Sequence, residues 1–135
     1  MSRKSKGANA ERELVSMFNH EGWGAIRVAG SGSNRFPNPD VLAGNGFRRV
    51  AIEAKSSKKQ KKYLTEEDLN QLRLFSDSFG AESWIGIRFN NQPWYFLNPE
   101  DLDKTKKGFV ISLESAKNKG LSFEELVKKF EIQKV

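Results

Sequence analysis

The chain has 135 residues, of which 37% are hydrophobic and 30% are charged, a composition typical of a globular protein. This length supports one hydrophobic core, so we expect a single domain over residues 1–135. The chain has no cysteine, which excludes disulfides and thiolate metal sites, so a metal would have to bind carboxylates or the lone His20. No apolar run is long enough to cross a membrane and the first residues are largely polar and basic, so we expect a soluble, unexported protein that stays in the cytoplasm.

Basic residues outnumber acidic ones by 23 to 17, which gives a net charge of +6 and a pI near 9.6. Such a surface attracts polyanions, although many basic proteins bind no nucleic acid. The basic residues form an N-terminal arm and a loop after Lys55: Arg3, Lys4 and Lys6 in the arm, and Lys58, Lys59, Lys61 and Lys62 in the loop. A solvated loop is the alternative, but basic residues beside carboxylates favour binding to a phosphate backbone.

The first 39 residues predict a helix, a strand and a loop. Over residues 8–21, until Gly22 ends the run, apolar side chains recur at the spacing of an amphipathic helix: Leu14, Val15 and Phe18. Residues 23–28 are apolar and β-prone, as in a short strand. Residues 29–39 are rich in Gly, Ser, Asn and Pro and predict a mobile loop.

A hairpin and a second helix follow. Residues 40–43 and 47–55 have the composition of strands, and Gly44-Asn45-Gly46 between them predicts that they pair antiparallel. Thr65 and Asp68 resemble a capping box at the start of a helix. Apolar residues then continue at helical spacing up to Gly80: Leu69, Leu72, Phe75 and Phe79.

The C-terminal part predicts more strands and a short last helix. Residues 83–89, 94–97 and 109–113 are expected to extend the same sheet. The run over residues 94–97 alternates faces, so we expect some of its side chains to leave the core, where a dimer surface or ordinary packing would use them. Ser122 and Glu125 form another capping box. The order of elements predicts an α/β fold with a mixed sheet and helices on its faces.

Glu11 lies on the apolar face of the first predicted helix, because at about 100° per residue it shares that face with Leu14 and Phe18. A carboxylate that faces inward is costly unless it is paired or binds a metal. We therefore expect Glu11 to be functional. Glu13 points roughly the other way and is expected to be an ordinary surface charge.

The predicted hairpin brings a second set of polar residues together. Glu53 and Lys55 are two positions apart on a strand and share one face, and the turn brings Glu53 near Asp40 at the start of the other strand. Two carboxylates beside an ammonium group suit phosphodiester hydrolysis, since the carboxylates can hold Mg²⁺ and the ammonium can stabilise developing charge. A surface ion pair is the alternative.

These residues resemble two known patterns. Pro39-Asp40 followed by Glu53-Ala54-Lys55 resembles the PD-(D/E)xK signature of restriction-endonuclease-like nucleases, which is moderately specific. In order and spacing, a larger set of motifs resembles the archaeal Holliday junction resolvases along the whole chain: Lys6-Gly7, Ala10 to Leu14, Arg27, Gly30 to Ser33, Pro39-Asp40 and Ile52 to Ser56.

The resemblance implies a restriction-endonuclease-like fold, a mixed β-sheet flanked by α-helices, in a homodimer that acts on four-way DNA junctions. It implies that Glu11, Asp40 and Glu53 form a metal site for Mg²⁺, with Mn²⁺ as a substitute, and that Lys55 is the catalytic lysine. It also implies that Ser31 is a loop serine needed for cleavage. The residues that it implies bind DNA are Arg12, Arg27, Ser33 and Arg35. The loop around Phe36 and Asn38 differs between relatives, so its DNA contacts are not implied.

Two other functions fit the same residues. One is a nuclease of the same superfamily that cuts ordinary duplex DNA, because no residue pattern by itself encodes a four-way substrate. The other is a module of the same fold that binds DNA without cleaving it, although the chain carries all four site residues, Glu11, Asp40, Glu53 and Lys55.

Overall fold

A long helix, α1 (Arg3–His20), opens the computed structural model, which describes residues 3–30 and 36–129. The expected helix is confirmed and begins five residues earlier than its apolar pattern. Leu14 and Phe18 are fully buried, as their spacing predicts. The helix ends where Gly22 adopts a φ of 84°, which allows the Trp23 amide to donate to the Phe18 carbonyl at 3.0 Å.

The main sheet has five strands in the order β1-β2-β3-β5-β6. β3 and β5 are parallel and the other neighbours are antiparallel, so the sheet is mixed, as predicted. The strands are β1 (Gly24–Arg27), β2 (Val41–Gly44), β3 (Arg49–Ser57), β5 (Glu82–Phe89) and β6 (Trp94–Leu97). The expected hairpin is confirmed: the Asn45 side chain accepts from the amides of Phe47 and Arg48, and Gly46 has a φ of 95°.

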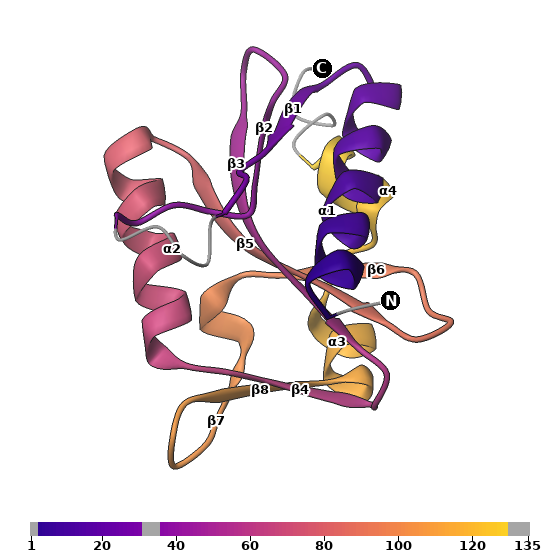
Figure 1. Cartoon of the computed structure of the whole chain (residues 1–135), viewed down its shortest axis with the longest axis vertical. Helices are drawn as coiled ribbons and strands as arrows, with labels where there is room; N and C mark the ends of the chain where they lie inside the picture. The colour runs from indigo at the N-terminus through magenta and orange to yellow at the C-terminus, as the bar shows by residue number, and fades with distance from the viewer. Residues whose placement is uncertain (1–2, 31–35, 130–135) are drawn as a thin grey trace.

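Helices cover both faces of this sheet, as Figure 1 shows: α1 and α4 (Phe123–Lys128) lie on one side and α2 (Glu66–Phe79) on the other. Val50 and Ile52 of β3 belong to the apolar cluster under α1 and α4. The intervening Ala51 belongs to the cluster under α2. β3 is therefore buried on both faces along its first half, while its second half carries the polar residues of the hairpin.

Both predicted capping boxes are confirmed. The Thr65 hydroxyl accepts from the Asp68 amide and the Asp68 carboxylate accepts from the Thr65 amide at the start of α2. The helix ends at Gly80, which has a φ of 83°. Ser122 and Glu125 make the same reciprocal bonds at the start of α4.

A second, three-stranded sheet was not predicted. Its order is β4 (Lys61–Leu64), β8 (Phe109–Ser112) and β7 (Asp103–Lys104). The expectation that residues 109–113 extend the main sheet is wrong, because they pair with β4 instead. Lys61 and Lys62 lie on a strand and not in a loop, and η2 (Pro99–Asp101) and α3 (Leu113–Lys119) are further elements that the sequence did not reveal.

β6 lies at the edge of the main sheet, but its side chains are not a free surface. Trp94, Phe96 and Leu97 are buried and Tyr95 packs against the cluster under α2. Of the two expected uses of this run, a dimer surface or ordinary packing, the structure shows ordinary packing. Elements that follow β6 in the chain cover it, and the backbone of Leu121 pairs with that of Phe96 in an isolated β-bridge.

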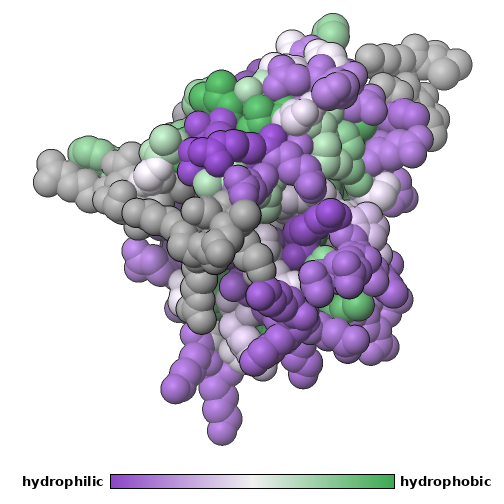
Figure 2. All heavy atoms as spheres, turned by 45° about the vertical axis from the view of Figure 1, so that its right-hand side comes forward, coloured by the Kyte–Doolittle hydropathy of each residue, from purple (hydrophilic) through white to green (hydrophobic). Residues whose placement is uncertain are grey.

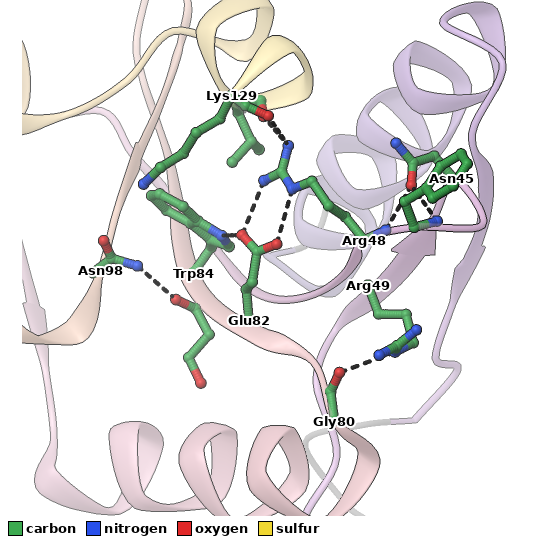
Figure 3. Close-up of polar contacts among 11 residues, drawn as sticks. Asn45, Arg48, Arg49, Gly80, Glu82, Trp84, Asn98 and Lys129 are labelled. Carbon is green, nitrogen blue, oxygen red and sulfur yellow. Dashed lines mark hydrogen bonds and ion pairs between the residues drawn. The ribbon is translucent and has the colours of Figure 1, made fainter. Parts of the chain in front are cut away.

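Arg48 joins three elements at the end of the sheet where β3 and β5 begin (Figure 3). Its guanidinium donates to both oxygens of Glu82 at 2.9 Å and to the Leu126 carbonyl of α4 at 2.7 Å. Trp84 also donates to Glu82, at 3.0 Å.

Within the described ranges, no helix is long and apolar enough to span a membrane.

Candidate active site

Asp40 stands immediately before β2 and is fixed by the neighbouring strand. Its amide donates to the Ile52 carbonyl at 2.9 Å, and its carboxylate accepts from the Ala54 amide at 2.9 Å. Since these two bonds flank Glu53 along β3, they hold the Asp40 carboxylate next to that of Glu53. The hairpin thus brings together the two acids that the sequence predicted to be neighbours.

Glu53 and Lys55 share one face of β3, as strand alternation predicts. The Lys55 Nζ lies 3.4 Å from the Glu53 Oε2 and 3.7 Å from the Asp68 Oδ2 of α2. Asp68 was predicted only as a capping residue. Its position beside Lys55 depends on how α2 packs against β3, and the local sequence pattern carries no signal for that packing.

The carboxylate of Glu53 is strongly perturbed. Burial, followed by repulsion from Asp40, raises the pKa of Glu53 to about 8, although the nearby Lys55 opposes the rise. Burial lowers the pKa of Lys55, but the carboxylates of Glu53, Asp68 and Asp40 outweigh burial and raise it. The site therefore holds more negative charge than one lysine neutralises, which favours the binding of a proton or of an added cation.

Glu11 faces the interior, as expected, and its side chain is 14% exposed. Burial and the charge of Asp40 raise the pKa of Glu11, while a hydrogen bond from Arg27 opposes the rise. Asp40 is therefore the common neighbour of Glu11 and Glu53. The Arg27 Nε lies 3.0 Å from the Glu11 Oε1, so the structure pairs Arg27 with this carboxylate.

A divalent cation suits part of this acid set. In residues 3–30 and 36–129, no three His, Cys, Asp or Glu side chains converge on one metal-binding point. Asp40 and Glu53 are adjacent, whereas Glu11 is turned to Arg27. Mg²⁺ is commonly held by one or two protein carboxylates and keeps several of its waters. The donor set of Asp40 and Glu53 fits that habit.

A groove of about 860 Å³ begins at the lysine of the site. It runs between α1, the ends of β3 and β5, and β4, and Ala10, Ser56 and Asn90 are among its lining residues. Among the described residues, the charged side chains that line it are all basic: Lys55, Lys58, Lys62 and Arg88. Arg88 was not singled out from the sequence. The groove suits a polyanion that passes next to the carboxylates.

Glu13 is exposed, as predicted, but it makes two specific contacts that the sequence did not indicate. Its carboxylate accepts from the Trp94 indole at 2.7 Å and lies 3.6 Å from the Arg88 Nε. Glu13 thereby links α1 to β5 and β6 at the edge of the groove. The helical-wheel argument placed Glu13 correctly away from the face of Glu11, but it took no account of the strands that flank α1.

The other predicted DNA-binding residues are more dispersed. Arg12 is exposed and donates to Asn9 at 3.2 Å. Lys62 is half-buried in the groove, and its basic neighbours are exposed: Lys58, Lys59 and Lys61. Several predicted residues lie outside the described part of the structure, either entirely or in their side chains: Ser31, Ser33 and Arg35 entirely, and Arg3, Lys4 and Lys6 in their side chains.

A second cavity, of about 480 Å³, lies at the opposite end of β5 and is less suited to catalysis. Its lining carries both signs of charge, including Arg73, Asp77 and Lys129. Its most buried acid, Glu82, already accepts from Arg48 and Trp84 (Figure 3). Burial alone would raise the pKa of Glu82, but these hydrogen bonds lower it, so this carboxylate is held as a structural anion.

Comparison with known proteins points to one family. A family model described as archaeal Holliday junction resolvase matches residues 2–135. The chain is 41% identical over 127 residues to the crossover junction endodeoxyribonuclease Hjc of Archaeoglobus fulgidus, which covers 94% of this chain and 93% of that protein. The protein of the same name from Methanocaldococcus jannaschii is 35% identical over 122 residues, covering 90% and 86%. A solved structure of the Archaeoglobus fulgidus protein, described as a Holliday junction resolvase, matches with a TM-score of 0.83 at 37% identity over 89% of this chain and 98% of that chain. This match confirms the expected restriction-endonuclease-like α/β fold.

Proposed function

This chain belongs to the archaeal Holliday junction resolvase family, and from that premise we propose that it is an endonuclease that cuts four-way DNA junctions during recombination and repair in the cytoplasm. The observation that carries the proposal is the cluster of Asp40, Glu53 and Lys55 at the head of a basic groove. The cluster supplies the groups for phosphodiester hydrolysis, and the groove supplies an electrostatic path for the DNA backbone.

Asp40 and Glu53 would hold a divalent cation, for which we propose Mg²⁺ with Mn²⁺ as a substitute. When bound, such an ion polarises a phosphate and makes a water molecule more acidic. A cation at this position would also favour the ionised form of Glu53, whose pKa burial and Asp40 otherwise raise to about 8.

Lys55 contributes a fixed positive charge beside the phosphate. Its raised pKa keeps the ammonium protonated at neutral pH, because three carboxylates surround it. A protonated lysine stabilises the negative charge that develops on phosphate oxygens during hydrolysis. Asp68 would help to hold the ammonium in place, since its Oδ2 on α2 lies 3.7 Å from the Lys55 Nζ.

Glu11 and Arg27 would change partners when DNA binds. A phosphate near Arg27 offers the guanidinium a charged acceptor, and Glu11 would then be free to join Asp40 as a further ligand. We assign Arg12 and the loop residues Ser33 and Arg35 to DNA contacts and Ser31 to cleavage. These assignments rest on the family motifs alone.

Two nicks on opposed strands are needed to resolve a junction, and the described part of this chain supplies one set of Asp40, Glu53 and Lys55. We therefore assign a homodimer to the active form. An apolar groove of about 280 Å³ beside the edge strand β1 is a suitable contact surface, because Ile26 and Phe79 line it and are 59% and 48% exposed.

A substrate panel tests the proposal. Native protein should cut a four-way junction in Mg²⁺, should be inactive in EDTA, and should leave linear duplex and single strands of the same sequence largely intact. Equal cutting of linear duplex would point to a general duplex nuclease. Junction binding without cutting in Mg²⁺ or Mn²⁺ would point to a binding module and would refute the proposed activity.

A further inference from the structure

The excess positive charge of the chain is concentrated in the second sheet and α3. Residues 58–64 and 103–119 contain nine lysines and two acids, Asp103 and Glu114, whereas the rest of the chain contains fourteen basic and fifteen acidic residues. These segments therefore carry a net charge of +7, and the rest of the chain carries −1, which together give the +6 of the whole chain. They form the lower part of the molecule in Figure 1, and hydrophilic residues cover most of the corresponding part of Figure 2.

The hairpin between β7 and β8 carries three of these lysines, Lys104, Lys106 and Lys107. All three are exposed, and their ammonium groups make no ion pair with any described residue. In contrast, Lys119 of α3 is paired with Asp103 at 3.2 Å. The hairpin lysines thus have their charge available for a partner outside the subunit.

The hairpin is held firmly against the rest of the second sheet. The Thr105 amide donates to the Gly108 carbonyl at 2.9 Å and closes the turn. A Cβ at Gly108 would lie 2.5 Å from the Leu64 carbonyl oxygen of β4, so the backbone at this position approaches β4 as closely as only glycine allows. A side chain here would push the hairpin away from β4.

The second sheet places these lysines beyond the groove of the active site. Lys62 of β4 lines the groove with Lys55, while Lys104 lies on β7, across β8 from β4. Strands are roughly 5 Å apart, and β4 rises by about 3.3 Å per residue. The hairpin lysines therefore lie on the order of 10–20 Å from Lys62, too far to act on the phosphate at the site and within reach of another stretch of the same DNA.

We propose that the β7–β8 hairpin is a second phosphate-binding surface, which contacts the backbone of double-stranded DNA flanking the scissile position. This inference rests on the proposed function. Lysine ammonium groups bind phosphates as point charges and release condensed counterions, so such contacts are measured by the salt dependence of binding. The hairpin contributes affinity and placement, and the chemical step remains with Asp40, Glu53 and Lys55.

The test compares two variants that each remove two positive charges. One is Lys106→Gln with Lys107→Gln. The control is Arg73→Gln with Lys128→Gln, since Arg73 lines the cavity at the other end of β5 and Lys128 is paired with Glu124. Junction binding is measured in EDTA over a range of salt concentrations, and cleavage is measured in Mg²⁺ at saturating protein.

For each subunit that contacts the DNA, the hairpin variant should reduce the slope of log K against log salt by about 2 and weaken junction binding roughly tenfold near 0.15 M salt, with the cleavage rate at saturation unchanged. The control should keep the native slope. An unchanged slope in the hairpin variant, or an equal reduction in the control, would overturn the inference. Failure of the native protein to bind or cut junctions would instead refute the proposed function, so the two failures are distinguishable.

Discussion

Replacing Glu53 with Gln should stabilise the metal-free protein at alkaline pH. Burial and Asp40 raise the pKa of Glu53 from an ordinary 4.5 to about 8, so the folded state holds a proton that the unfolded state releases. The contribution of Glu53 to stability is therefore fully present below about pH 4.5, falls as the pH rises toward 8, and levels off above it. The rise in pKa corresponds to roughly 5 kcal/mol at about 1.4 kcal/mol per pH unit, which is an upper limit because the Glu53 side chain is only partly shielded from water.

Urea unfolding in EDTA from pH 5 to pH 9 measures this effect. The free energy of unfolding of Glu53→Gln minus that of native protein should rise by about 2–4 kcal/mol from pH 5 to pH 8.5, because the neutral amide has no charge to desolvate. Glu11 also has a raised pKa, but it is present in both proteins and cancels in the comparison. The raised pKa of Lys55 acts only as the pH rises above its ordinary 10.5, outside this range. Native and variant curves that stay parallel across the range would refute the reasoning.

Three further predictions concern the basic cluster, the Arg48 contacts and the dimer. The basic cluster consists of Lys58, Lys59, Lys61 and Lys62, and replacing all four with Gln should weaken junction binding and lower its salt slope by about 3–4 for each subunit that contacts the DNA. Binding titrations at several salt concentrations measure this slope, and an unchanged slope would mean that the four lysines are an ordinary solvated surface. Arg48→Met should lower the free energy of unfolding by about 2–3 kcal/mol, because it removes the guanidinium that donates to both oxygens of Glu82 and to the Leu126 carbonyl of α4; a loss below about 0.5 kcal/mol in urea would contradict this. A mixed dimer of native and Asp40→Asn subunits should bind a plasmid-borne cruciform and nick one strand, so abundant linear product, when subunits cannot exchange or rebind, would show that one site cuts both strands.

The residues of the site were predictable because they depend on short-range geometry. The Gly44-Asn45-Gly46 turn fixes the register of β2 against β3, and that register places Asp40 beside Glu53. Alternation along β3 then puts Lys55 on the same face. Helical periodicity likewise turned Glu11 inward, where its pKa responds to Asp40.

The contacts that were missed depend on packing between elements far apart in the sequence. Asp68 reaches Lys55 because α2 covers β3, and Glu13 reaches Trp94 because α1 crosses the edge of the groove. The second sheet was missed because β4 is four residues long and begins with two lysines, so its apolar alternation is too short to distinguish from a basic loop. Its partner β8 follows more than forty residues later, and no turn sequence links the two.

The most direct test of the proposed site is cleavage of a four-way junction by Asp40→Asn beside Asp77→Asn. Both changes convert one aspartate to an amide, but Asp77 is exposed on α2 and lines the cavity away from Glu53. In Mg²⁺, Asp40→Asn should lose cleavage by at least about a thousandfold and still bind the junction with near-native affinity, while Asp77→Asn should cut at the native rate. Substantial cutting by Asp40→Asn at saturating Mg²⁺ would contradict the assignment of Asp40 and Glu53 as the centre of the reaction.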